Sequence, residues 1–183
     1  IGAILIIAFV YSTGINFSWL TAGIISIVLI AGAASLRAQR NSPSVKIQSD
    51  PLVKKIATAH IITTFIVLIL GTIVTGSGPH AGDATAPRFP FDLRTMAWIH
   101  ADSVIALFGI TFGFFVARGV SDQTKKRLKI FLAIALGQGL IGYVQWFNDL
   151  PELLVGLHLA GSTLVWIASW RVWLSVTKRM DSK

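Results

Sequence analysis

His100 and His158 occupy matching places in the sequence, where they could bind a metal together. His100 lies in WIHADSV and His158 in GLHLAGS, each about four or five residues inside an apolar segment. At about 1.5 Å rise per residue, both lie about 6 to 8 Å below the same boundary. Ionisable groups inside a membrane are functional candidates by default, and bundle cores can hold an iron between two imidazoles. The spacing predicts an iron ligated by His100 and His158, and the alternative is that each histidine bonds to a neighbouring helix or lies in the interfacial zone.

The other two histidines lack this pairing. His60 falls near the opposite end of its segment, which favours an interfacial or hydrogen-bonded histidine. His80 lies in the polar stretch VTGSGPHAGD, where it could gate access, bind a propionate or be solvated. The same loop carries Arg88 and Arg94, which could pair with haem propionates, and a solvated basic loop is the alternative.

Glycines recur where a flat ring would need room, although small residues also serve ordinary packing of membrane helices. They are Gly109, Gly113, Gly137, Gly139, Gly142, Gly156 and Gly161.

The composition is that of an integral membrane protein. Of the 183 residues, 54% are hydrophobic and 13% charged, and the mean hydropathy is +0.70. A soluble domain carries about 25% charged residues. The chain has no cysteine, which excludes disulfides, thiolate metal sites and covalently attached haem. The fold class predicted is all-α: a polytopic membrane protein with a four-helix transmembrane bundle and an additional N-terminal transmembrane helix.

Apolar stretches of about 20 residues, the length that crosses a bilayer, divide the chain. They run from Phe17 to Leu36, Ile56 to Thr75, Met96 to Ala117, Leu128 to Phe147 and Leu153 to Leu174. We expect residues 1–36 to comprise the end of one helix and one full transmembrane helix. Residues 37–55 then form a linker, 56–174 a haem-binding four-helix bundle and 175–183 a basic tail.

The basic residues indicate the orientation of the chain. All 16 Lys and Arg residues except Arg88 and Arg94 fall in the linker, in the connector 118–129 or in the C-terminal segment from Arg171 onward. The positive-inside rule therefore predicts a multi-pass protein of the cell membrane with loops 37–55 and 118–129 and the C-terminus in the cytoplasm. The same distribution explains the net charge of +8 without a nucleic-acid partner.

Two successive hairpins look alike. ILGTIVTGSG is followed by WIHADSV, and GQGLIGYVQW by GLHLAGS. This pattern indicates a duplicated hairpin in which a glycine-rich helix precedes a helix with a histidine near its start.

Four motifs in order resemble the C-terminal half of the heme A synthase family, over about Lys54 to Leu174 of this chain. They are VTGSGPHAGD, WIHADSV, LGQGLIGYVQWF and LPELLVGLHLAGS. That resemblance implies a membrane enzyme that oxidises the methyl group of haem O to the formyl of haem A. It implies that His100 and His158 bind the iron of a non-covalent haem b, a cofactor, while haem O is the substrate. The reaction site of the family lies in its N-terminal half, and the resemblance implies that residues 1–36 are the remnant of that half. The family's fourth helix carries a histidine, whereas residues 1–36 have none, and Ala22 or a neighbour stands at that position.

The catalytic residues, the electron donor and the oligomeric state, including a possible homo-oligomer, are left open by the sequence. Partners implied by the resemblance are membrane lipid, haem O and the farnesyltransferase that makes it. A non-enzymatic b-type electron-transfer cytochrome needs the same two histidines and is the alternative function. A cofactor-free structural or transporter-like bundle is the third.

Overall fold

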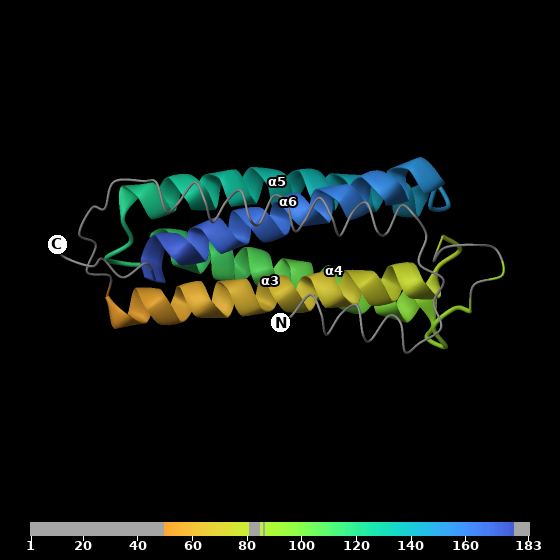
Figure 1. Cartoon of the computed structure of the whole chain (residues 1–183), viewed down its shortest axis with the longest axis horizontal. Helices are drawn as coiled ribbons and strands as arrows, with labels where there is room; N and C mark the ends of the chain where they lie inside the picture. The colour runs from red at the N-terminus through yellow and green to blue at the C-terminus, as the bar shows by residue number, and fades with distance from the viewer. Residues whose placement is uncertain (1–49, 81–84, 86, 178–183) are drawn as a thin grey trace.

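The computed structural model describes residues 50–80, 85 and 87–177, which form four long helices (Figure 1). They are α3 (Pro51–Ser77), α4 (Leu93–Val116), α5 (Asp122–Phe147) and α6 (Glu152–Thr177). The described residues contain no strand, which confirms the predicted all-α class. The predicted N-terminal helix, residues 1–49 and the tail after residue 177 lie outside the described residues.

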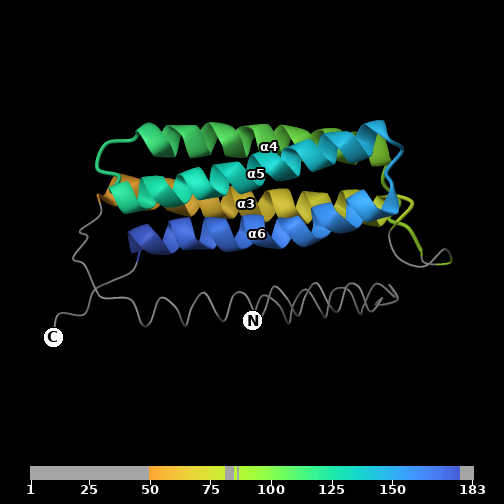
Figure 2. The same cartoon turned by 90° about the horizontal axis from the view of Figure 1, so that it is seen from above.

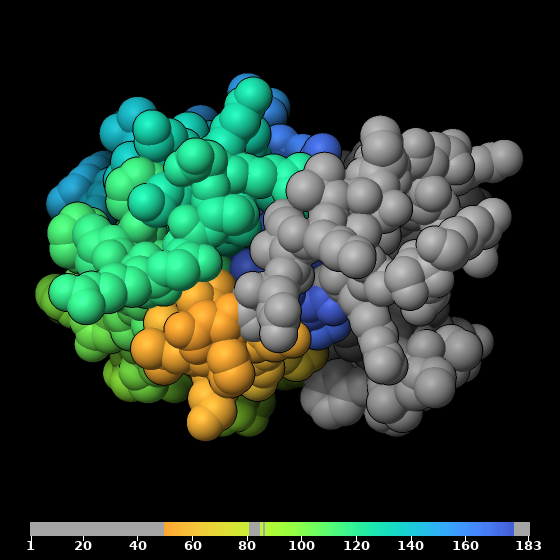
Figure 3. Space-filling model, turned by 90° about the vertical axis from the view of Figure 1, so that its left-hand side faces the viewer, coloured from red at the N-terminus to blue at the C-terminus, as the bar shows by residue number. Residues whose placement is uncertain are grey.

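The helices run up and down along one long axis (Figures 1 and 2). α3 packs against α4 and α6, and α5 packs against α6, while α4 and α5 touch only briefly. We call the end where α3 and α5 begin the basic end, and the end where α4 and α6 begin the histidine end. Figure 3 looks onto the basic end, where the start of α3 and the α4–α5 connection are neighbours. Gly119 in that connection has a φ of +79°, which favours glycine, and packs beside Asp50.

Polar capping residues set the helix starts. The Asp50 carboxylate accepts a hydrogen bond from the Leu52 amide (2.8 Å), with Pro51 in the first turn. Asp92 accepts from the Thr95 amide and Ser121 from the Thr124 amide. Three helices therefore begin three to six residues before the apolar stretches that predicted them.

These polar first turns change the predicted connector most. Lys125, Lys126, Arg127 and Lys129 belong to α5, so only residues 117–121 link α4 to α5. Hydropathy marks the part of a helix that sits in hydrocarbon, whereas caps mark where its hydrogen bonding starts.

All four helices are long and apolar enough to cross a membrane. Large apolar side chains such as Ile105, Phe112, Leu140 and Leu153 lie on their outer faces with more than half of their surface exposed. Lipid contact explains so much exposed apolar surface. The prediction of a multi-pass membrane architecture is confirmed to this extent.

The close-packed core occupies only the basic half of the bundle. Its largest fully buried side chains include Phe114, Phe131 and Leu128. Toward the histidine end, none of the described helix residues has a fully buried side chain. This holds for α3 after Val67, α4 before Leu107, α5 after Ala135 and α6 before Gly161. Half of the molecule is therefore a packed core, and the other half is more open.

The two hairpins repeat each other position by position, in agreement with the predicted duplication. A shift of 71 residues carries the cap Asp50 onto the cap Ser121, and a shift of 58 carries His100 onto His158. The same shifts relate pairs of buried positions: Ala57 with Leu128, His60 with Phe131, Leu107 with Val165, Thr111 with Ser169 and Phe114 with Val172. The bundle is thus built from two similar halves, which places His100 and His158 at equivalent points.

Candidate functional site

His100 lies in the second turn of α4 and faces α3. Its Nδ1 lies 3.1 Å from the carbonyl oxygen of Val67, to which it can donate. No hydrogen bond to Nε2 occurs among the described residues. A histidine that donates Nδ1–H to a backbone carbonyl keeps the lone pair of Nε2 available, the usual arrangement of a metal-ligating imidazole.

A glycine makes room for this ring. A Cβ at Gly71 would lie 3.1 Å from Cε1 of His100, closer than an ordinary carbon contact. Gly71 therefore lets the imidazole lie directly against the backbone of α3.

His158 repeats this arrangement in the second hairpin. Gly142 of α5 abuts its ring, with a hypothetical Cβ 3.4 Å from Cε1. The carbonyl of Gln138, the residue equivalent to Val67, faces the ring. Nδ1 of His158 is nevertheless buried without a hydrogen bond. A buried nitrogen without a partner is uncommon and marks a group that a ligand or a water could satisfy.

The two imidazoles are close enough to interact electrostatically. They extend from α4 and α6, which are not in direct contact with each other in the bundle. Equivalent positions in the two hairpins thus place two imidazoles at the histidine end of the bundle. Two imidazoles on different helices of a bundle are a donor set that could bind one metal.

His60 does not join this pair. It is fully buried seven residues before Val67, which is about 10 Å further along α3 toward the basic end. Its Nδ1 lies 3.2 Å from the Ser169 hydroxyl, and its ring meets Phe131 edge-on at 4.5 Å. The hydrogen-bonded interpretation of His60 is confirmed, whereas the interfacial one is wrong because the core encloses it.

The loop from α3 to α4 returns along the end of α3. The Phe89 amide donates to the Gly76 carbonyl (2.9 Å), and the Phe89 ring occupies the space where a Cβ of residue 76 would be. Nη1 of the neighbouring Arg88 is buried without a partner. Arg94 is exposed in the first turn of α4, where its charge lies near Asp92. Of the two arginines, Arg88 has a buried donor that could pair with an anion.

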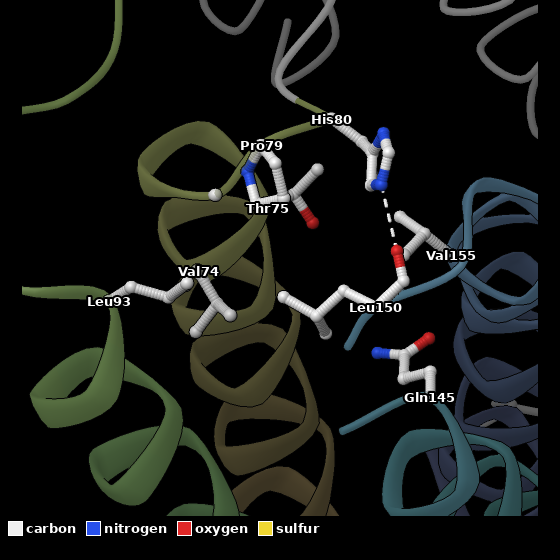
Figure 4. Close-up of a pocket in the computed structure, with 9 residues that line it drawn as sticks. Val74, Thr75, Pro79, His80, Leu93, Gln145, Leu150 and Val155 are labelled. Atoms are coloured by element: carbon white, nitrogen blue, oxygen red, sulfur yellow. Dashed lines mark hydrogen bonds between the residues drawn. The ribbon is translucent and has the colours of Figure 1, made fainter. Parts of the chain in front are cut away.

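His80 connects the two hairpins at the histidine end (Figure 4). Its Nε2 lies 2.7 Å from the carbonyl oxygen of Leu150 in the α5–α6 turn. Asp149 and Leu150 both adopt a positive φ, at 58° and 57°, which brings that carbonyl within reach. His80 is therefore a partly buried residue that bonds to the second hairpin.

A small cavity lies beneath this bond. Its walls include Thr75, Pro79, Leu93, Gln145 and Val155 (Figure 4), and its volume is about 30 Å³. Oε1 of Gln145 is buried there without a partner. The cavity suits a water molecule and is far too small for a macrocycle.

The glycines that contact the histidines are only partly those that the sequence suggested. A Cβ at Gly109, Gly113, Gly137, Gly139 or Gly156 would meet nothing within 4 Å, so they face open space. Gly142 contacts a histidine, and Gly161 is covered by the Gln138 side chain. Sequence reasoning missed Gly71 and the two carbonyls that face the histidines. Aligning the hairpins at a shift of 71 pairs Gly71 with Gly142 and would have revealed that glycine.

The donor set fits a haem better than a bare metal ion. Within residues 50–80, 85 and 87–177, no three His, Asp or Glu side chains gather as a metal cluster. A haem supplies its own equatorial nitrogens and asks the protein for axial ligands only. Two imidazoles, one anchored through Nδ1, meet that requirement.

Comparison with known proteins gives no relative: no family model, curated protein or solved structure matches this chain.

Proposed function

We propose that His100 and His158 are the axial ligands of a non-covalent b-type haem. The observation that carries this proposal is the repeated Gly–His–carbonyl arrangement, Gly71 with His100 and Gly142 with His158, at equivalent positions of two hairpins. A single buried histidine is readily structural. Two histidines that share a depth, a contacting glycine and a facing carbonyl are better explained by a shared ligand.

We further propose that the chain acts in haem modification, in the manner of the heme A synthase family. Its role would be to hold a haem cofactor while the methyl group of haem O is oxidised to the formyl of haem A. When bound, the haem supplies redox chemistry that side chains lack. Support comes from the four motifs that resemble this family, two of which contain the histidines brought together here.

The residues of this chain would bind and orient the haem. The Val67 carbonyl fixes the ring orientation of His100 through Nδ1. Gly71 and Gly142 let the rings lie against the backbones of α3 and α5. The unpaired Nη1 of Arg88 could donate a charge-assisted hydrogen bond to a propionate. Arg94 lies near the same end and would be the second arginine of such a site.

The proposed orientation follows the basic residues. The basic end would face the cytoplasm of a cell-membrane protein, and the histidine end with His80 and Arg88 would face outward. Haem O would then be received at the outer half, with the farnesyltransferase that makes it as a candidate partner.

The test is a reduced-minus-oxidised absorption spectrum of the detergent-purified protein, with pyridine extraction to identify the haem. His100→Ala and His158→Ala should each abolish a low-spin b-type signal. His80→Ala is the matched control, because it removes an imidazole from the same end that lies in the α3–α4 loop rather than on α4 or α6. A colourless folded wild-type protein, or an unchanged spectrum in both variants, would contradict the assignment.

A b-type electron-transfer cytochrome is the second candidate. It requires only the two imidazoles, whose rings contact Gly71 and Gly142 and face the Val67 and Gln138 carbonyls. Incubation with haem O and a reductant in air separates the two. Formation of haem A supports the enzyme, whereas reversible redox cycling with haem O unchanged supports the carrier.

A further inference from the structure

Two arginines lie side by side near the basic end of the bundle. Nη1 of Arg127 on α5 donates to the backbone carbonyl of Arg171 on α6 at 2.6 Å. The charge of Arg127 is also close enough to that of Arg171 for mutual repulsion. Two positive side chains are therefore held together by a contact that neutralises neither.

Among the described residues, no carboxylate forms an ion pair with either arginine. The Arg171 side chain is exposed and that of Arg127 is partly exposed. Arg127 uses one of its donors on the Arg171 carbonyl, and the guanidinium of Arg171 has no hydrogen bond among these residues. The pair thus presents several free N–H donors and two charges to an anion.

The depth of the pair matches a lipid headgroup. Arg127 is five residues from the start of α5 and Arg171 six from the end of α6, or about 8 to 9 Å along the helices. Trp166, Trp170 and Trp173 form a continuous row on α6, with ring centroids 6.0 and 5.2 Å apart. Tryptophans mark the boundary between headgroups and hydrocarbon. Arg171 is next to Trp170 in the chain, so the arginines lie at that boundary.

We infer that Arg127 and Arg171 form a binding site for the phosphate of an anionic phospholipid in the leaflet at the basic end. A guanidinium fork matches phosphate oxygens bidentately. A phosphodiester between the two side chains would relieve their repulsion, while its acyl chains would extend along the exposed apolar surfaces of α5 and α6. Basic positions between transmembrane helices are known to take anionic headgroups in this way. This inference is independent of any haem.

Native mass spectrometry of the detergent-purified chain with added dioleoylphosphatidylglycerol tests the inference. The key variant is Arg171→Gln, because it removes a charge while leaving the Arg127 bond to the backbone of residue 171 intact. We expect at least about fivefold weaker phosphatidylglycerol binding in it, and at least about tenfold weaker binding in Arg127→Gln/Arg171→Gln. Arg171→Lys should bind at an intermediate level because it keeps the charge without the fork.

The matched control is Arg118→Gln/Lys126→Gln, which removes two exposed charges at the same end. It should bind phosphatidylglycerol like the wild type. The site would be overturned if Arg171→Gln bound phosphatidylglycerol with wild-type affinity, or if the control lost as much affinity as Arg171→Gln. Either result would show a general attraction between the basic end and anionic lipid. Equal binding of dioleoylphosphatidylcholine would overturn the preference for an anionic lipid. Displacement of the lipid by millimolar inorganic phosphate would show a free-phosphate site instead.

Discussion

The two halves of the bundle are built from the same helices but are packed differently. Toward the basic end, Phe114, Phe131 and Val172 are fully buried, and the buried hydroxyls of Ser169 and Thr64 bond to each other, so that His60 Nε2 is the one buried side-chain atom without a partner there among the described residues. Toward the histidine end, Gln138, Gln145 and His158 have buried atoms without partners. Native proteins keep most buried polar atoms satisfied. The difference indicates that the basic half stabilises the fold, whereas the histidine half is arranged for a ligand.

The largest effect on the difference between the two halves is expected when an aromatic ring is removed from the core of the basic half. In water-soluble proteins Phe→Ala in a core costs about 3–5 kcal/mol, but lipid replaces much of the lost apolar environment in a membrane. We therefore expect Phe131→Ala to lower the free energy of unfolding by about 2 kcal/mol through the cavity it leaves. Titration with a denaturing detergent in mixed micelles would measure it.

Phe147→Ala is the control for this change, because Phe147 ends the same helix with 78% of its side chain exposed. Its loss should leave unfolding almost unchanged. Equal destabilisation by both substitutions would show that stability is not concentrated in the basic half.

A smaller effect is expected at the buried hydroxyl of Ser169. Its oxygen contacts both His60 Nδ1 (3.2 Å) and the Thr64 hydroxyl (3.0 Å). Ser169→Ala leaves His60 without a hydrogen bond at either nitrogen, since Nε2 already lacks one. We expect a loss of about 1 kcal/mol in stability, as for other hydrogen bonds between membrane helices, with no change in any haem spectrum.

The equivalent residue of the other hairpin supplies the control. Thr111 is also buried, but its hydroxyl bonds only to Leu107 of its own helix. Thr111→Val keeps the shape and should be nearly neutral. A loss in Thr111→Val as large as that in Ser169→Ala would contradict a special role for the His60–Ser169 contact.

At the histidine half, Gly71→Ala should affect the site more than the fold. The added Cβ would press on Cε1 of His100 at 3.1 Å, so the ring must shift by a few tenths of an ångström. We expect a change in the reduction potential or low-spin spectrum of the bound haem, while the unfolding free energy changes by less than about 1 kcal/mol. Gly137→Ala, at an open position on α5, should change neither. Identical spectra for the wild type and Gly71→Ala would show that the glycine contact does not position His100.

The sequence predicted the helical class, the order of the hairpins and the matched histidines because these depend on hydropathy and spacing. It could not predict which groups His100 and His80 meet, since those contacts depend on the rotation of each helix about its axis. In a membrane the outside of a bundle is as apolar as its inside, so periodicity carries little information about rotation. The predicted helix starts lie several residues after the observed ones, because hydropathy detects only apolar residues. Asp50, Asp92 and Ser121 cap first turns that are too polar to count as part of an apolar stretch.

The smallest effect concerns two caps at opposite ends of the bundle: Asp92 caps α4 with an ionisable carboxyl, whereas Ser121 caps α5 with a hydroxyl. Hydrogen bonds from the Thr95 amide and hydroxyl hold the pKa of the Asp92 carboxyl below its ordinary value of 3.8. A lowered carboxyl pKa stabilises the folded state above the ordinary value, and that stabilisation is lost as the pH falls through the lowered one. Hydrogen exchange of the Thr95 amide, corrected for its intrinsic rate, should therefore accelerate below about pH 4. The Thr124 amide, capped by the Ser121 hydroxyl, should keep its protection. Asp92→Asn should remove the pH dependence, because the asparagine amide still caps the helix but does not ionise. If acid still accelerates exchange of the Thr95 amide in this variant, the whole histidine end loosens at low pH, and the Asp92 cap is not the cause.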